Sequence, residues 1–153
     1  MALEAGDKAP VFAGTDQNGN KISLKDFAGK KLILFIYPED DTPTCTATAC
    51  NLRDNFGELK KKGFQIVGLS ADDQDSHKRY ADKFSLSFPL IADTSKKILN
   101  DYEAWGEKNL YGHIYIGIIR KTYIIDEEGV ILKIIKKVRA EDHTQQILES
   151  LEK

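Results

Sequence analysis

The sequence predicts an α/β protein in which helices flank a central mixed β-sheet. Two continuous apolar runs, 31–37 and 64–70, are typical of strands that are covered on both faces, as in a parallel sheet. Helical patterns alternate with these runs, and a hairpin pattern near the C-terminal end makes the sheet mixed. The length of 153 residues suits a single domain over 1–153 whose core needs no disulfides.

The individual elements follow from local signals. Asn18-Gly19 favours a tight turn, so a short hairpin is expected within 9–26, followed by a helical turn over 23–27. One helix over about 43–62, ended by Gly63, is predicted by apolar residues at helical spacing: Ala49, Leu52, Phe56 and Leu59. Further helices are expected at 75–84, 94–102 and 141–152, and further strands at 89–92, 120–125 and 130–135.

This order of elements is a hairpin, then β-α-β-α-β-α, then β-β-α. It is compatible with a thioredoxin-like fold that carries an N-terminal β-hairpin. The segment 111–119 is unusually apolar. It is interpreted either as a loop packed over the core or as an exposed patch that contacts a partner or a second subunit.

Charge and hydropathy exclude several function classes. Lys and Arg number 22 against 24 for Asp and Glu, and a net charge of -2 gives no electrostatic case for binding nucleic acid or a membrane surface. No apolar run approaches the roughly 20 residues of a membrane span. The N-terminal residues lack the basic-then-apolar pattern of a signal peptide, so the expected location is cytoplasmic.

Two cysteines, Cys45 and Cys50, need an explanation in a reducing compartment. There a cysteine pair is more often catalytic, metal-binding or simply buried than a permanent bridge. Metal binding is disfavoured because there is no second cysteine pair and the histidines are scattered. Each of His77, His113 and His143 is instead expected at the surface or an edge. The absence of C-x-x-C also disfavours a thioredoxin-type reductase.

Cys45 lies where the first buried strand passes into the first long helix, a place where open α/β sheets bind ligands. Thr42 and Pro43 fit the N-cap and the first helical position, so Cys45 falls in the first turn. Free amides and the helix dipole stabilise a thiolate there, and the thiolate is the nucleophile. The three acids at 39–41 would oppose that thiolate unless they point to solvent.

Cys50 follows Cys45 by five positions. In an intact helix the two would lie about 7.5 Å apart along the axis and point about 140° apart. A disulfide tolerates a Cα separation of only about 7 Å, so a bridge requires local unwinding. The first turn is the least stable part of a helix, which makes a helical reduced form and a partly unfolded oxidised form the expectation.

These residues resemble a known family. Pro38-x-x-x-Thr42-x-x-Cys45 matches the P-x-x-x-T/S-x-x-C signature of peroxiredoxins. The second cysteine at +5 and the residues after it resemble the peroxiredoxin Q subgroup, also called bacterioferritin comigratory protein. The resemblance covers nearly the whole chain, through segments at 6–10, 67–72, 76–78, 88–93 and 120–126.

The resemblance implies a thiol peroxidase that reduces hydrogen peroxide and organic hydroperoxides without a metal or other cofactor. Cys45 would be the peroxidatic cysteine and become a sulfenic acid. Cys50 would be the resolving cysteine and form an intrachain disulfide with it. Thioredoxin or a similar dithiol would reduce that bridge by exchange. A monomer is expected, with a weak dimer as the alternative.

The resemblance also implies roles for other residues. Arg120 would stabilise the thiolate and the peroxide oxygens, or else form a surface ion pair at a strand end. Thr42 would offer its hydroxyl to the sulfur and the peroxide, or else only cap the helix. Pro38 would shape the loop and shield the sulfur, or else only end the strand. For Arg53, independently of the resemblance, a salt bridge with Asp54, Glu58 or a neighbouring element is expected.

Other functions stay open. A general thiol–disulfide exchanger would act on proteins and consume little peroxide. A redox-switched interaction protein would use the same oxidation to change a binding surface. A structural domain with two incidental thiols would show ordinary cysteine reactivity.

Overall fold

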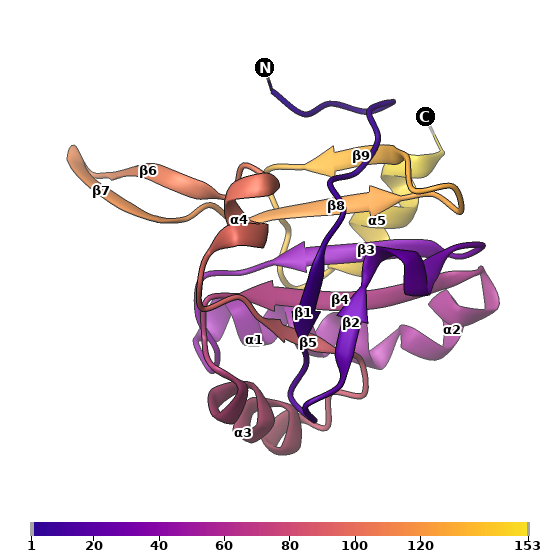
Figure 1. Cartoon of the computed structure of the whole chain (residues 1–153), viewed down its shortest axis with the longest axis horizontal. Coiled ribbons are helices and arrows are strands. Elements are labelled where there is room, and N and C mark those ends of the chain that lie inside the picture. The colour runs from indigo at the N-terminus through magenta and orange to yellow at the C-terminus, as the bar shows by residue number, and fades with distance from the viewer. Residues whose placement is uncertain (1, 153) are drawn as a thin grey trace.

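The computed structural model describes residues 2–152, apart from the side chain of Leu110. Its centre is a five-stranded mixed sheet in the order β5-β4-β3-β8-β9 (Figure 1). β3 runs parallel to β4, and β4 to β5, whereas β8 is antiparallel to both of its neighbours. The predicted mixed sheet is confirmed. Its strands are β3 (Lys31–Ile36), β4 (Phe64–Ser70), β5 (Leu90–Ala92), β8 (Lys121–Ile125) and β9 (Ile131–Ile135).

Helices cover both faces of this sheet, as predicted, because each central strand is apolar on both sides. Ile33 and Phe35 of β3 join a core with α1, α2, α3 and α5, whereas Leu32 and Leu34 join a second core with α4. Within residues 2–152 no helix is long and apolar enough to cross a bilayer. The helices are η1 (Leu24–Phe27, a 3-10 helix), α1 (Pro43–Asp54), α2 (Phe56–Lys61), α3 (Gln74–Phe84), α4 (Lys97–Asp101) and α5 (His143–Leu151).

The helices α3 and α5 lie within two residues of their predicted bounds, whereas two other predictions differ more. The single helix expected over 43–62 is broken at Asn55, whose side-chain amide donates to the Asn51 carbonyl at 2.8 Å. This local bond competes with the regular helical pattern. The helix expected over 94–102 is shorter because Lys96 adopts a left-handed backbone with φ 66°. The predicted apolar face is nevertheless buried: Ala49, Leu52, Phe56 and Leu59.

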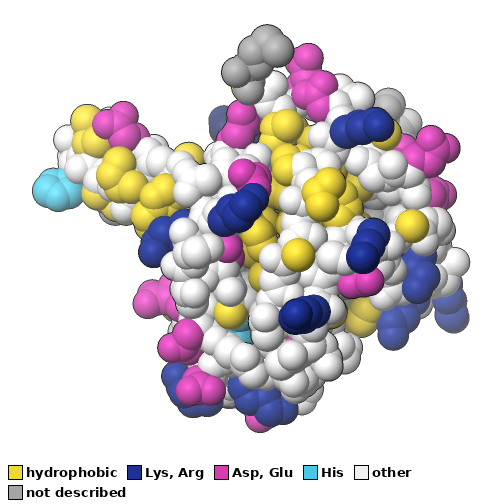
Figure 2. Space-filling view, in the orientation of Figure 1, with side chains coloured by type: hydrophobic (Ala, Val, Ile, Leu, Met, Phe, Trp, Pro, Cys, Tyr) yellow, Lys and Arg dark blue, Asp and Glu magenta, His cyan; other side chains and the backbone are white. Residues whose placement is uncertain are grey.

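The predicted N-terminal hairpin is present as β1 (Ala13–Thr15) and β2 (Lys21–Ser23). A second hairpin, formed by β6 (Trp105–Leu110) and β7 (His113–Ile118), projects from the body of the molecule (Figure 1). The prediction of a loop packed over the core is therefore wrong. Tyr111 is 100% exposed and Ile114 63% exposed, and hydrophobic side chains are visible along the projection in Figure 2.

The turn of this second hairpin lacks the Asn-Gly pair that marks the N-terminal hairpin. Tyr111 and Gly112 both have positive φ, as the central residues of a type I′ two-residue turn require. The flanking β-branched and aromatic residues favour strands, and Ile114, Tyr115 and Ile116 are exposed, as in the alternative of an exposed patch. Whether a partner or a second subunit covers them stays a prediction.

Two of the three histidines are fully buried, so the expectation of surface positions is wrong for His77 and His143 and correct for His113. His143 joins α5 to β8, since its Nε2 lies 2.9 Å from Thr122 Oγ1 and its Nδ1 lies 2.8 Å from Gln146 Oε1. Backbone partners orient the Gln146 amide, so Nδ1 of His143 donates and Nε2 accepts. Burial lowers the pKa of His143, which is thus held neutral.

Gly68 in β4 is a tightly packed glycine, and replacing it tests the core. A Cβ there would lie 2.7 Å from Leu90 Cδ2 and 2.9 Å from Phe35 Cζ. Gly68→Ala is expected to lower the free energy of unfolding by about 1–3 kcal/mol, because overpacking displaces neighbours. The control Gly57→Ala has nothing within 4 Å in α2 and should raise stability by up to about 1 kcal/mol. Urea unfolding measures both, and equal effects would contradict the packing argument.

His143 predicts a pH dependence of stability. The pKa of His143 is lowered on folding, so at mildly acidic pH the imidazole binds a proton in the unfolded chain but not in the folded chain. The stability that neutral His143 contributes is complete above its ordinary pKa of about 6.5 and is lost as the pH falls below that value. His143→Gln should flatten this acid slope, whereas His113→Gln at an exposed site should not. Urea midpoints across the pH range decide, and parallel slopes for both variants would refute the assignment.

Candidate active site

Cys45 lies at the edge of the sheet where β3 ends and the chain turns into α1. β8 is antiparallel to β3, so it begins at this same edge, where Ile36 pairs with Lys121. Arg120 directly precedes β8 and is thereby brought to the first turn of α1. Pro38 lies half-buried at the start of the loop between β3 and α1. The sheet topology thus brings together residues that are 75 positions apart in the chain.

The start of α1 has the predicted geometry. Thr42 is the N-cap with an extended backbone, and Pro43 is the first helical residue. The first intrahelical bond joins the Thr46 amide to the Thr42 carbonyl at 2.8 Å. The amide of Cys45 precedes that bond and belongs to the free N–H groups at the positive end of the helix. This position favours a negatively charged sulfur.

The Thr42 side chain does not cap the helix. Its hydroxyl donates to the Glu39 carbonyl at 2.9 Å, so its hydrogen is used within the loop. The lone pairs of Oγ1 are then the part of the hydroxyl that is free to accept a hydrogen bond.

The Cys45 sulfur is buried and faces a guanidinium group. Cys45 is 1% exposed, and Nη2 of Arg120 donates to its Sγ at 3.2 Å. Arg120 bonds to the sulfur instead of forming the alternative surface ion pair. Its other terminal nitrogen, Nη1, is buried without a hydrogen-bond partner among the described residues. A buried donor without an acceptor is costly, so Arg120 offers a further donor at this site.

Tyr80 of α3 packs beside the first turn and was not singled out from the sequence. Its hydroxyl donates to Thr46 Oγ1 at 3.3 Å. Burial raises the pKa of Tyr80 well above its ordinary value, and negative charge on Cys45 and Asp40 adds to the shift. Tyr80 therefore stays a neutral donor. A tyrosine at helical spacing gives no sequence signal that separates this role from an ordinary core residue.

Cys50 lies half-buried in the same unbroken helix, and both thiols are free. This is the helical arrangement expected of the reduced form, while the pairing of the two cysteines stays a prediction. The Asn51 side chain ties this part of α1 to the start of α5, because its Oδ1 accepts from the Thr144 amide at 2.8 Å. The predicted Arg53–Asp54 salt bridge is confirmed at 2.8 Å.

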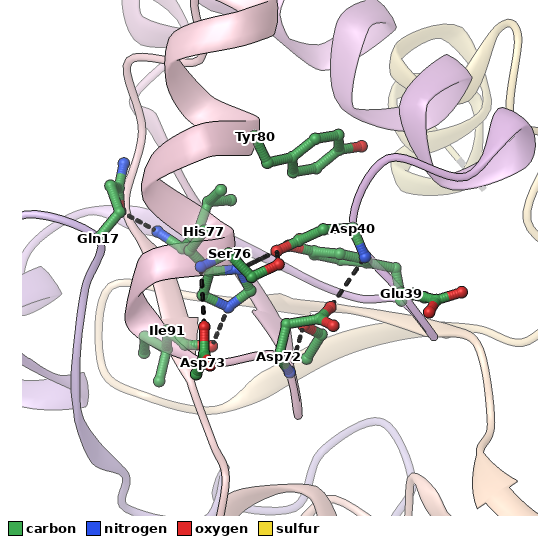
Figure 3. A network of polar contacts seen from close by, with 12 residues as sticks. Gln17, Glu39, Asp40, Asp72, Asp73, Ser76, His77, Tyr80 and Ile91 are labelled. Carbon is green, nitrogen blue, oxygen red and sulfur yellow. Dashed lines mark hydrogen bonds and ion pairs between the residues drawn. The ribbon is translucent and has the colours of Figure 1, made fainter.

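The three acids of the loop do not all point to solvent. Glu39 is exposed, and exposed Asp41 pairs with Lys83 at 2.8 Å. The expectation is wrong for Asp40, which is 8% exposed and turned inward. Tyr37 Oη, just after β3, donates to its carboxylate at 2.6 Å. From the start of α3, Ser76 Oγ and His77 Nδ1 each lie 2.7 Å from the same carboxylate (Figure 3).

Asp40, Asp72 and His77 also form the kind of group that can hold a metal ion, with ligand-type atoms within 4.8 Å of one another. Hydrogen bonds already occupy these atoms. Oδ2 of Asp72 accepts from the Asp40 amide and from Ser70 Oγ, both at 2.8 Å. The chemistry of the group therefore fits a hydrogen-bonded network, and the cysteines take no part in it.

Comparison with known proteins places this site in a family. A sequence profile of the AhpC/TSA family matches residues 5–134. A relative from Coxiella burnetii is 40% identical over 151 residues, which cover 99% of this chain and 100% of that protein. The Escherichia coli K12 protein named Peroxiredoxin Bcp is 38% identical over 149 residues, 97% of this chain and 96% of that protein.

Solved structures agree. One is the structure of Xanthomonas campestris bacterioferritin comigratory protein from a study of its alkyl peroxide reduction activity. It matches with a TM-score of 0.85 at 29% identity, and the match covers 92% of this chain and 90% of that chain. A mutant of Xylella fastidiosa PrxQ matches with a TM-score of 0.91 at 22% identity, covering 99% and 97%, and supports the fold alone. These likenesses confirm the predicted thioredoxin-like fold. The chain belongs to the AhpC/TSA family, and along its full length it is similar to peroxiredoxins of the Bcp and peroxiredoxin Q type.

Proposed function

We propose that this chain is a thiol-dependent peroxidase that reduces hydrogen peroxide and organic hydroperoxides through Cys45. The observation that carries the proposal is the 3.2 Å contact between Arg120 Nη2 and the Cys45 sulfur at the start of α1. A buried sulfur between a guanidinium group and a helix N-terminus is held as a nucleophile. The related Xanthomonas protein, studied for alkyl peroxide reduction, supports the inclusion of organic hydroperoxides.

In the first step the Cys45 thiolate attacks one oxygen of the peroxide. A sulfur–oxygen bond forms and the O–O bond breaks, and the leaving oxygen departs with the electron pair and takes up a proton. The product on the protein is a sulfenic acid. Arg120 stabilises the charge that moves onto the leaving oxygen, and its unpartnered Nη1 is the donor available for that oxygen.

Thr42 and Pro38 complete the proposed site. Since the Thr42 hydroxyl hydrogen is bonded to the Glu39 carbonyl, its lone pairs accept a hydrogen bond from a peroxide O–H. Half-buried Pro38 shapes the loop in front of the sulfur and limits access of water.

In the second step Cys50 attacks the sulfenic sulfur, water leaves and a Cys45–Cys50 disulfide forms. Because both cysteines lie in one helix, α1 has to unwind locally for this bond. Thioredoxin or a similar dithiol then reduces the bridge by exchange, which suits a protein of the reducing cytoplasm. The proposed working unit is a monomer.

The roles of the two cysteines predict three distinct outcomes. Wild type mixed with hydrogen peroxide should lose two thiols, Cys50→Ser should stop at a sulfenic acid, and Cys45→Ser should be inert. Stopped-flow fluorescence of Trp105, combined with thiol counts and mass spectrometry, measures all three. Peroxide consumption by Cys45→Ser at the wild-type rate would sink the proposal, and fast reduction of protein disulfides with slow peroxide turnover would favour the exchanger.

Arg120 predicts a loss of rate when its fork of donors is removed. Arg120→Lys keeps the charge but loses the paired N–H groups, so kcat/KM for peroxide should fall about 100-fold, as for loss of an oxyanion donor. The matched control is Arg139→Lys, because Arg139 is an exposed arginine that pairs with Glu149. Steady-state peroxide consumption compares them, and an equal loss in both variants would remove Arg120 from the site.

A further inference from the structure

Asp40 and His77 form a buried ion pair next to the Cys45 loop (Figure 3). His77 is 0% exposed and Asp40 is 8% exposed, and Nδ1 of the ring lies 2.7 Å from Oδ2 of the carboxylate. Tyr37 and Ser76 donate further hydrogen bonds to the same carboxylate. A buried carboxylate with this many donors is fixed in place.

The partners of His77 determine its protonation. Nε2 lies 3.0 Å from the Ile91 carbonyl, which can only accept, so this nitrogen carries a hydrogen. Nδ1 faces the Asp40 carboxylate, an acceptor that already receives the Tyr37 and Ser76 hydroxyls. Both ring nitrogens therefore face acceptor atoms, which is the hydrogen-bond pattern of an imidazolium that neutralises Asp40.

The sheet topology explains why this pair reaches the loop. β4 runs parallel to β3, so α3, which follows β4, begins beside the loop that follows β3. The Asp40 amide donates to Asp72 Oδ2 at 2.8 Å, which ties the loop to the end of β4 as well. The Ile91 carbonyl extends the same network to β5. The loop is thus fastened at Asp40 to three neighbouring elements.

The fastened position lies two residues before the N-cap of α1. Between them, Asp41 adopts a left-handed backbone with φ 60°, a conformation that non-glycine residues rarely take. The turn therefore needs support from its surroundings. Tyr80, one turn after His77 on α3, bonds to Thr46 in the first turn of α1. α3 thus contacts the chain on both sides of Cys45.

The charge of the pair also bears on the sulfur. The groups that bond to Asp40 are the hydroxyls of Tyr37 and Ser76, the Asp72 carboxylate through the Asp40 amide, and the His77 ring. Exposed Arg79 lines the same surface pocket as Asp40, but among the described residues it forms no ion pair with Asp40. Burial and the nearby Asp40 raise the pKa of Tyr37, so Tyr37 stays neutral. Lys83 is used by Asp41 at the surface. His77 is thus the group placed to balance Asp40, and without it a buried negative charge would oppose a Cys45 thiolate.

We propose that Asp40 and His77 are a positioning pair for Cys45: they hold the loop that aims α1 at Arg120, and His77 cancels a carboxylate that would otherwise disfavour the thiolate. The inference rests on the proposed function, in which Cys45 reacts as a thiolate. Neither residue touches the sulfur in the described contacts, so both act through the loop and through charge.

Two variants separate position from charge. His77→Gln leaves Asp40 without its cation, so oxidation of Cys45 by hydrogen peroxide should slow by about 10- to 100-fold, the range that small misplacement near a reacting group produces. The midpoint pH for alkylation of Cys45 by iodoacetamide should also rise. Asp40→Asn removes the negative charge, so oxidation should slow while the alkylation midpoint does not rise. The Cys50→Ser background isolates this first step, and mass spectrometry counts the sulfenic acid.

Asp93→Asn is the matched control. Asp93 is 5% exposed and its Oδ2 accepts from the Leu99 amide at 2.8 Å, so it is an equally buried carboxylate that fixes α4 instead of the loop. It should lose thermal stability while its oxidation rate and alkylation midpoint stay at wild-type values. Any of three results would overturn the proposal. His77→Gln could keep the wild-type oxidation rate and alkylation midpoint, or Asp93→Asn could slow oxidation as much as His77→Gln does. The alkylation midpoint could also rise equally in His77→Gln and Asp40→Asn.

A gentler variant covers failure of His77→Gln to fold. Ser76→Ala removes one donor from Asp40 Oδ2 at a half-buried position and should slow oxidation in the same direction by a smaller factor. A wild-type rate in folded Ser76→Ala would then count against the pair. Measuring the alkylation midpoint needs no peroxide, so it tests the Asp40–His77 pair separately from the proposed function. If wild type reduced peroxide no faster than a free thiol, the proposed function would be wrong. The alkylation midpoint of His77→Gln would still test the pair.

Discussion

The antiparallel pairing of β8 with β3 is the constraint on which the site depends. Because β8 begins where β3 ends, Arg120 meets the first turn of α1 and donates to the Cys45 sulfur. A parallel β8 would place Arg120 at the opposite edge of the sheet, about 20 Å away at the usual strand rise. The parallel pairing of β4 adds the second part of the site, since it starts α3 beside the same loop. One edge of a mixed sheet thus collects the proposed nucleophile Cys45, the Arg120 guanidinium group and the hydrogen-bond network around Asp40.

The same contacts bear on the unwinding that a Cys45–Cys50 disulfide requires. The argument that a first helical turn opens most easily holds for a helix without tertiary partners. Here that turn is tethered by Arg120, by the Tyr80–Thr46 hydrogen bond and by the Asp40 network. The opening therefore has to break tertiary contacts as well as helical ones. Near Cys50 the tertiary contacts are chiefly the hydrogen bonds of the Asn51 side chain to the backbone at Glu141 and Thr144.

Local patterns predicted much of this fold, whereas contacts between distant segments lay beyond them. The apolar run 64–70 coincides with β4, and the helical face at Ala49 and Leu52 is buried as expected. At the break, the Asn55 side chain and its backbone amide both donate to the Asn51 carbonyl, a local bond that apolar spacing does not reveal. The Cys45–Arg120 contact came from family resemblance, since 75 residues separate the two. His77 was expected at the surface because its partner Asp40 is 37 residues away and no local pattern joins them.

The two buried histidines, His77 and His143, lie in opposite electrostatic environments. His77 faces a carboxylate and is placed to balance the charge of Asp40. His143 faces a hydroxyl and an amide oxygen, and burial together with the charge of nearby Arg120 lowers its pKa and keeps it neutral. A charged His143 would add a second cation behind the site, and a neutral His77 would leave an unbalanced anion beside it. In this arrangement Arg120 faces the sulfur. No carboxylate among residues 2–152 lies within ion-pair distance of its guanidinium group to cancel the positive charge. The positive charge of the site is thereby directed at Cys45.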